Sequence, residues 1–254
     1  MTSKQHNYKV SVVMPAYNAE KFVKAAVDSV LSQTYENLEL LIIDDCSTDN
    51  TYNLLENIAM TDARIKLFKN EQNLGVANTR NRGFELADGE YVALIDSDDI
   101  WRREKLEKQI SVIEGQKADL VYCSYAFINE KGQSMNKEYI VPEKTDFESL
   151  LRENVIGCST VLISKNIYRK YRFLTDYYHE DYVLWLSILK EKYIFIGLKD
   201  VLVNYRVMEN SRSGNKVKSA IKRWNIYRDF LKIPTLKAGI IWIKYVINGT
   251  IKYS

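Results

Sequence analysis

The sequence has few cysteines, histidines and prolines, and each scarcity excludes a class of protein. Its 254 residues include three cysteines, two histidines and three prolines. Three widely spaced cysteines form neither a disulfide framework nor a zinc pattern, which favours a reducing cytosol. With so few histidines, we expect any metal to be held mainly by oxygen. The first residues lack the apolar stretch of a secretory signal, and no apolar run approaches the ~20 residues that span a bilayer.

Charge is distributed unevenly along the chain. The formal net charge is +3, but residues 216–254 hold nine Lys and Arg against one acid, a net +8 that leaves −5 on residues 1–215. A mildly acidic body with a basic tail is poorly suited to binding nucleic acid. It suits a body that attaches to an anionic surface through its tail.

Apolar runs alternate with amphipathic segments in the first half of the chain. We expect strands at residues 10–14, 38–43, 65–68 and 91–95, and helices at about 19–33, 48–61 and 76–87. This alternation predicts an α/β fold with a mostly parallel central sheet and helices on both faces. The second half is looser, with strands expected at 120–128, 160–163 and 202–207, a polar excursion at 130–141, and helices at about 102–116 and 182–191.

The most informative stretch is Asp96-Ser97-Asp98-Asp99, directly after the apolar run at residues 91–95. Three carboxylates at one strand end repel one another and raise each other's pKa. Mg²⁺ and Mn²⁺ prefer such oxygen ligands and share them with substrate phosphates. Ligands of open α/β sheets also bind beyond the carboxyl ends of strands. The stretch therefore predicts a site for a divalent cation and a diphosphate.

Two other interpretations of this stretch compete with the metal site. A calcium loop of the EF-hand type needs an oxygen ligand and a glycine where this chain has Ile100 and Trp101, so that reading fails. Alternatively, Asp98 or Asp99 caps the following helix, although one acid would suffice for that.

A second acidic strand end, Asp44-Asp45, follows the run at residues 38–43. Two parallel strands ending in acids can flank one crevice where the strand order reverses. An acid there often receives a ribose hydroxyl or a base N–H. The alternative is a turn and helix start, for which Ser47 and Asp49 already suffice.

Four segments together resemble the family 2 glycosyltransferases, which are inverting enzymes with the GT-A fold. In order they are residues 10–18 (VSVVMPAYN), 43–49 (IDDCSTD), 75–81 (GVANTRN) and 93–99 (ALIDSDD). The resemblance covers roughly residues 8–210. Each segment alone is a weak signal, but all four in this order are specific.

The resemblance implies a nucleotide-diphospho-sugar donor, usually a UDP-sugar, and a bound Mn²⁺ or Mg²⁺. It assigns nucleotide binding to Pro15, Ala16, Tyr17, Asp45, Arg80, Asp96 and Ser97. Asp96 and Asp98 are assigned to the metal, with Asp99 as a further ligand or a close neighbour of the ion. The acceptor is expected to be a glycan or a lipid-linked sugar of bacterial surface polysaccharide or lipopolysaccharide synthesis.

The pair Glu180-Asp181 resembles the family's Glu-Asp pair, whose Asp is assigned as the general base. A base must take the proton of the attacking acceptor hydroxyl. Glu180 is a second candidate, for catalysis or for contact with a sugar. The alternative is a helix start, where acids are favoured by the helix dipole.

The chain departs from the family pattern at Met208, where many relatives carry His. If that His contacts the diphosphate or the metal, Arg206 or Arg212 must supply the positive charge here. Trp101 could stack on a sugar of the donor or acceptor, or it could be a buried anchor.

The tail is predicted to be helical to about residue 231, broken near Pro234, and helical again to about 251. Leu236, Ile240 and Ile243, with Ile247 and Ile251, share one face. Such a helix lies in an anionic membrane interface or docks on the body with its lysines outward, and the basic excess favours the interface. We thus expect a GT-A catalytic domain at 8–212, with a nucleotide-binding half at about 8–118 and an acceptor-side half at about 119–212. A basic tail follows at 213–254, and the protein is expected to be cytoplasmic, at times on the inner face of the membrane.

Two other functions compete with the transferase. A non-catalytic nucleotide-sugar-binding protein could keep the fold, but it would have no need of Asp98 and Asp181. A phosphohydrolase with an Asp nucleophile would carry that Asp at the first strand, where this chain has Met14-Pro15.

Overall fold

A computed structural model describes residues 7–208 and 216–253 of the chain. Its strands are β1 (Val10–Ala16), β2 (Leu38–Asp44), β3 (Ile65–Lys69), β4 (Tyr91–Leu94), β5 (Ile100–Trp101), β6 (Leu120–Ile128), β7 (Ser134–Tyr139), β8 (Leu162–Ser164) and β9 (Phe195–Arg206). Its helices are α1 (Val23–Leu31), α2 (Thr51–Ala59), α3 (Val76–Leu86), α4 (Lys105–Gly115), α5 (Phe147–Arg152), α6 (Lys165–Lys170), α7 (Glu180–Leu189), α8 (Lys216–Asn225) and α9 (Thr235–Tyr253). A 3₁₀ turn, η1 (Cys158–Thr160), and a π-helical turn, η2 (Ile226–Phe230), complete the list.

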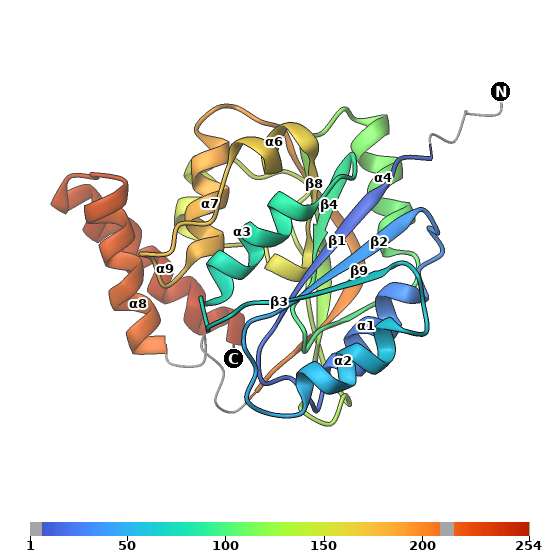
Figure 1. Ribbon diagram of the computed structural model, residues 1–254. Coiled ribbons are helices and arrows are strands. Elements are labelled where there is room, and N and C mark those ends of the chain that lie inside the picture. Colours follow the sequence, from blue (N-terminus) through green and yellow to red (C-terminus); the bar gives the residue numbers. More distant parts are fainter. Residues whose placement is uncertain (1–6, 209–215, 254) are drawn as a thin grey trace.

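One sheet runs through the whole molecule in the order β3-β2-β1-β4-β8-β6-β9-β5, with β7 added beside β6 (Figure 1). Strands β3, β2, β1 and β4 are mutually parallel. The second half is mixed, because β8 runs antiparallel to both β4 and β6 while β9 is parallel to β6. The predicted α/β sheet is confirmed, but only its first half is parallel throughout, and the second half combines parallel with antiparallel pairs.

Helices cover both faces of the sheet, and the strand sequences alternate accordingly. Val13 and Leu41 face a core shared with α3, α6 and α7. Val12 and Leu40 face a second core shared with α1, α2 and α4. Successive side chains of a strand point to opposite faces of the sheet. Because helices cover both faces, both sets of side chains are apolar, and the strands appear in the sequence as continuous apolar runs.

Several short elements were not predicted. Strand β7 lies within the polar excursion expected at 130–141, and most of its residues are exposed. An edge strand whose side chains are mostly exposed does not need alternating apolar residues, so its sequence does not show the strand pattern. Helices α5 and α6 have six residues each, too few for a periodic signal.

The C-terminal helices pack against the body, although one face of α9 remains exposed. Tyr227 of η2 donates a 2.8 Å hydrogen bond to the Leu151 carbonyl, and Trp242 Nε1 donates a 2.7 Å bond to the Ala220 carbonyl. Ala238 and Ile241 of α9 are buried in the same core as α7. The break expected near Pro234 lies between η2 and α9. The docking alternative thus holds for the inner face of α9.

Candidate functional site

A cleft of about 1070 Å³ opens at the carboxyl ends of β1, β2 and β4. Its lining on this side includes the predicted nucleotide-binding residues, which are Pro15, Ala16, Tyr17, Asp45, Arg80, Asp96 and Ser97. The opposite wall is built from distant segments: residues 153–160, residues 178–181, and parts of α8 and α9. The cleft therefore lies between the parallel half of the sheet and the C-terminal half of the chain, where ligands of open α/β sheets bind.

Strand β4 delivers Asp96 and Asp98 into the cleft. Asp96 Oδ1 accepts a 2.6 Å hydrogen bond from Arg80, and the Asp96 backbone N–H donates to Ser159 Oγ at 2.9 Å. Burial and the nearby charge of Asp96 raise the pKa of Asp98 to about 6. The mutual repulsion predicted for these acids is thus present, and a cation would relieve it.

Asp99 lies beneath the cleft, not in its lining. It is 1% exposed, and its Oδ1 accepts the backbone N–H of Arg206 at 2.9 Å, whereas Oδ2 has no partner in the described residues. Burial, together with Asp98 and Asp96, raises the pKa of Asp99 well above its usual range. Of the two roles predicted for Asp99, ligand or close neighbour of the ion, its position beneath the cleft favours the neighbour, which ties β4 to β9.

The guanidinium of Arg206 is also engaged elsewhere. It donates to the carbonyls of Asp98, Asn129 and Glu130 at 2.8–3.0 Å, and Arg206 is 5% exposed. These bonds occupy Nε and Nη1, and Arg206 is not part of the cleft lining, so the structure gives no support to the diphosphate role predicted for it. Met208 does line the cleft, and Arg212, the other candidate, lies outside the described residues.

Trp101 is a buried anchor, not a platform for a sugar. It is 3% exposed, its Nε1 donates to the Ser159 carbonyl at 2.9 Å, and the Nζ of Lys105 lies 3.8 Å from the ring centroid. The anchor alternative holds because β5 packs this ring into the core behind α1. Helix α4 begins at Lys105, so neither Asp98 nor Asp99 caps it.

At the other acidic strand end, Asp45 organises a loop while also lining the cleft. Its Oδ1 accepts hydrogen bonds from Asn70 Nδ2 at 2.7 Å and from the Leu74 N–H at 2.9 Å, and its Oδ2 accepts the Gly75 N–H at 2.9 Å. Gly75 has a φ of +81° at the start of α3, a conformation that favours glycine. Asp45 thereby fixes the start of the helix that carries Arg80.

Arg80 joins the two sides of the cleft. Its Nη2 binds Asp96 at 2.6 Å and its Nη1 binds Glu180 at 2.9 Å, with Arg80 only 4% exposed. The bridge connects α3, the end of β4 and the first turn of α7. Sequence spacing gave no hint of this bridge, because Arg80 and Glu180 lie 100 residues apart.

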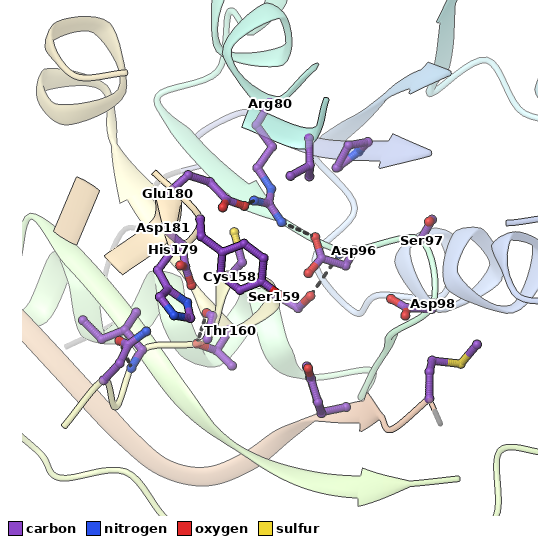
Figure 2. Close-up of a pocket in the computed structure, with 18 of the residues that line it drawn as sticks. Arg80, Asp96, Ser97, Asp98, Cys158, Ser159, Thr160, His179, Glu180 and Asp181 are labelled. Atoms are coloured by element: carbon purple, nitrogen blue, oxygen red, sulfur yellow. Dashed lines mark hydrogen bonds and ion pairs between the residues drawn. The ribbon is translucent and has the colours of Figure 1, made fainter. Parts of the chain in front are cut away.

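Asp181 follows Glu180 and lines the cleft opposite the β4 acids; Figure 2 shows Asp96 and Asp98 on one side and His179, Glu180 and Asp181 on the other. Its Oδ1 accepts the Tyr182 backbone N–H at 2.7 Å. Burial raises the pKa of Asp181, against the lowering effects of Arg80, Tyr182 and Arg223. A desolvated carboxylate of raised pKa is a stronger base than an exposed one.

The acids of the cleft fit a divalent cation only in part. In the described ranges, 7–208 and 216–253, no group of three His, Cys, Asp or Glu is placed to hold a metal. Mg²⁺, however, is commonly held by one or two carboxylates together with substrate phosphates. Asp96 and Asp98 supply such a pair, and the raised pKa of Asp98 indicates a carboxylate that gains from a neighbouring cation.

Sequence reasoning missed several residues of the opposite wall, among them Cys158, Ser159, Arg223 and Tyr245. No strand-end pattern marks them. Arg223 in particular is one basic residue in a basic tail, and only the packing of α8 on α7 singles it out.

The chain was compared with known proteins. The model of the family described as glycosyl transferase family 2 matches residues 11–172. The chain belongs to glycosyl transferase family 2. It is 35% identical over 243 residues to a putative teichuronic acid biosynthesis glycosyltransferase of Bacillus subtilis, with 96% of each chain covered. It is 38% identical over 251 residues to an Escherichia coli UDP-Glc:alpha-D-GlcNAc-diphosphoundecaprenol beta-1,3-glucosyltransferase, with 98% of this chain and 96% of the relative covered.

Solved structures agree on the fold. A Pyrobaculum calidifontis mannosyltransferase in complex with GDP-Man and Mn²⁺ matches with a TM-score of 0.71 at 20% identity, covering 95% of this chain and 70% of the other. S. aureus TarS in complex with UDP-GlcNAc matches with a TM-score of 0.67 at 19% identity, covering 94% and 71%. The predicted family and GT-A fold are confirmed, and this family 2 member is a glycosyltransferase.

Proposed function

We propose that this glycosyltransferase transfers a sugar from a UDP-sugar to a hydroxyl of a diphospholipid-linked sugar, with inversion at the anomeric carbon. One observation carries the proposal: a single cleft holds Asp96 and Asp98 on one side and the half-buried carboxylate of Asp181 on the other. That arrangement separates a site for the leaving diphosphate from a base for the acceptor. Similarity to relatives that are named for a diphosphoundecaprenol acceptor supports the acceptor class.

The reaction follows from this separation. The acceptor oxygen attacks the anomeric carbon of the donor sugar from the face opposite the diphosphate, and the carbon–oxygen bond to the phosphate breaks. Asp181 takes the proton of the acceptor hydroxyl. Glu180, held by Arg80, fixes the first turn of α7 and with it the position of Asp181.

Asp96 and Asp98 would hold Mg²⁺ or Mn²⁺ together with the donor diphosphate. When bound, the cation would neutralise negative charge that develops on the leaving nucleoside diphosphate. Tyr17, 47% exposed at the cleft rim, would stack on the base, and Asp45 would use its remaining lone pairs for the nucleoside beside its bonds to the loop.

A transfer assay tests the proposal. UDP-glucose and a short-chain α-GlcNAc-diphospholipid are incubated with enzyme and Mn²⁺ or Mg²⁺, and the anomeric configuration of the product is read by NMR. We expect a β-linked product that disappears with EDTA. Asp181→Asn should bind UDP normally but lose at least ~10²-fold in kcat, the usual scale of general-base catalysis. UDP binding without turnover on any donor or acceptor would favour the non-catalytic alternative.

We also propose that α9 holds the protein at an anionic membrane surface. Leu236, Ile240 and Ile243 are 81%, 52% and 55% exposed on one face of α9, and the adjoining Lys237 and Lys244 are exposed. An apolar face flanked by lysines is typical of helices that lie in the membrane interface. No helix among the described residues is long and apolar enough to cross a membrane.

Because α9 also contributes to the core, its deletion could unfold the protein, and loss of liposome binding could then not be assigned to the missing membrane contact. The sharper variant replaces Leu236, Ile240 and Ile243 with serine and leaves the buried face intact. Wild-type protein should float with liposomes that contain anionic lipid at low salt and less so at high salt. The triple variant should stay in solution while binding UDP normally. A wild-type protein that ignores the liposomes at low salt would refute this attachment.

A further inference from the structure

Arg223 of α8 lines the cleft on the side of α7 and is 3% exposed. Its Cζ lies 3.5 Å from the ring centroid of Tyr182 and 4.5 Å from that of Tyr245. Stacking of this kind uses the face of the planar guanidinium. The N–H groups lie in its plane and point away at the edge, where they can bind two oxygens of one anion.

Two nitrogens of Arg223 have no partner within the described part of the chain, one on each of the two edges that the guanidinium forms with Nη2. Nε and Nη1 of Arg223 are buried and make no hydrogen bond there. Arg80 also has a buried Nε without a partner, but its Nη1 and Nη2 bind Glu180 and Asp96, and Arg206 binds three carbonyls. A buried cation whose donors are unused is costly unless a ligand satisfies them. Arg223 is therefore a candidate for binding an anion in the cleft.

The position of Arg223 indicates which anion this is. Tyr182, on which Arg223 stacks, follows Asp181 in α7, so Arg223 belongs to the wall of the proposed general base. The donor diphosphate is expected across the cleft, beside Asp96 and Asp98. Asp181 is close enough for its charge to interact with Arg223, but it accepts no hydrogen bond from Nε or Nη1. A further anion that binds these nitrogens on the α7 side would therefore belong to the acceptor. The remaining lining on this side comes from the same helices, through Ser219, Ala220, Tyr245 and Val246.

We propose that Arg223 binds a phosphate of the diphosphate that joins the acceptor sugar to its lipid. The inference rests on the proposed function and adds the residue that recognises the acceptor linkage. It also explains why α8 and α9 pair a cleft-lining cation with the exposed apolar face of Leu236, Ile240 and Ile243. The lipid end of such an acceptor remains in the membrane while its head group reaches the cleft.

Two matched acceptors test the inference. One carries α-GlcNAc on a short alkyl chain through a diphosphate, and the other carries it on the same chain as a simple glycoside. Wild-type enzyme should prefer the diphosphate acceptor. Arg223→Gln should lower kcat/KM for that acceptor about ten- to hundredfold, mainly through KM, as expected for the loss of charge-assisted hydrogen bonds. The preference between the two acceptors should shrink accordingly, and Arg223→Lys should restore part of it.

Arg228 provides a matched control. It lies in η2, donates a hydrogen bond to the Ile233 carbonyl and does not line the cleft. Arg228→Gln should leave the preference between the acceptors unchanged. KM for UDP-glucose, measured for each variant, shows whether a substitution affects the diphosphate of the donor or only that of the acceptor.

Several outcomes would overturn the inference. If Arg223→Gln raised KM for UDP-glucose instead, the guanidinium would serve the donor. If Arg223→Gln lowered kcat/KM equally for both acceptors and also lowered the melting temperature, Arg223 would only dock the tail on the body. Equal use of the two acceptors by wild-type enzyme would refute recognition of the diphosphate even if no Arg223 variant folded. Absence of transfer to either acceptor would instead refute the proposed function itself.

Discussion

Two acidic strand ends flank the cleft, and they differ in how their charges are satisfied. At the end of β2, Asp45 receives three hydrogen bonds from the loop before α3, although the buried Asp44 Oδ1 has no partner in the described residues. At the end of β4, Asp98 has a pKa raised to about 6, and the buried Asp99 Oδ2 has no partner in the described residues. The β2 end stabilises the fold, whereas the β4 end stores repulsion that a ligand can relieve. Similar sequence patterns thus carry opposite energetic roles.

The largest effect should come from Asp98→Asn. Loss of this carboxylate removes a proposed ligand of the cation that stabilises the leaving diphosphate, an effect worth several kcal/mol. We expect kcat to fall by about 10³-fold at saturating donor, on the scale of one factor of ten per 1.36 kcal/mol. The melting temperature should not fall, because the substitution also removes a repelled charge. A variant with near-normal kcat would show that the β4 end is not the diphosphate site.

The pH dependence of activity provides a second test of the contrast between the two strand ends. The pKa of Asp98 is raised to about 6 and that of Asp181 is raised as well. Both must be ionised to act, so we expect kcat/KM to fall as pH decreases through about 6, well above the usual pKa of aspartate. A pH profile between 4.5 and 8 measures this limb. Activity that persists unchanged to pH 4.5 would contradict the raised pKa values.

The raised pKa of Asp98 also affects stability, but here raising the pH lowers the free energy of unfolding, whereas it raises activity. Between the unfolded pKa of 3.8 and about 6, the folded state binds more protons at Asp98 than the unfolded state does. The free energy of unfolding contributed by this group is therefore present at low pH and lost as pH rises through about 6. In urea titrations, Asp98→Asn should show a flatter dependence than wild type across this window. Identical slopes would indicate that Asp98 titrates normally.

A smaller effect is expected at the β2 end. Asp45→Asn replaces one accepting oxygen with an amide and leaves a loop N–H at Leu74 or Gly75 without its partner. The cost of such a buried donor is about 2 kcal/mol in the free energy of unfolding, measurable by urea unfolding at pH 7. Asp98→Asn is the matched control, because it removes the same charge from the other acidic strand end. If Asp98→Asn destabilised more than Asp45→Asn, the contrast between the two ends would be wrong.

Sequence alone predicted the parallel half of the fold and the acids of its strand ends. Its apolar runs and acidic turns are local, and the carboxyl ends of parallel strands meet at one edge. The opposite wall was not predictable in the same way. The bridge from Arg80 to Glu180 and the contact of Arg223 with Tyr182 join segments that are far apart in the chain. Arg206 shows the opposite error of sequence reasoning. Its charge suggested contact with a ligand, but its guanidinium donates hydrogen bonds to three backbone carbonyls.

The smallest expected effect concerns Asp49, which lies just beyond the β2 end. Its Oδ1 accepts the Thr51 N–H at 2.9 Å and its Oδ2 accepts the Glu20 N–H at 3.3 Å. These bonds to Thr51 and Glu20 lower the pKa of Asp49 although burial alone would raise it. The stability it contributes is therefore present above the unfolded pKa of 3.8 and lost as pH falls through the lower folded value. Asp49→Asn should cost about 1 kcal/mol or less at pH 7 and still less at pH 3, with kcat nearly unchanged. A kcat loss comparable to that of Asp98→Asn would mean that the β2 end, too, takes part in the reaction.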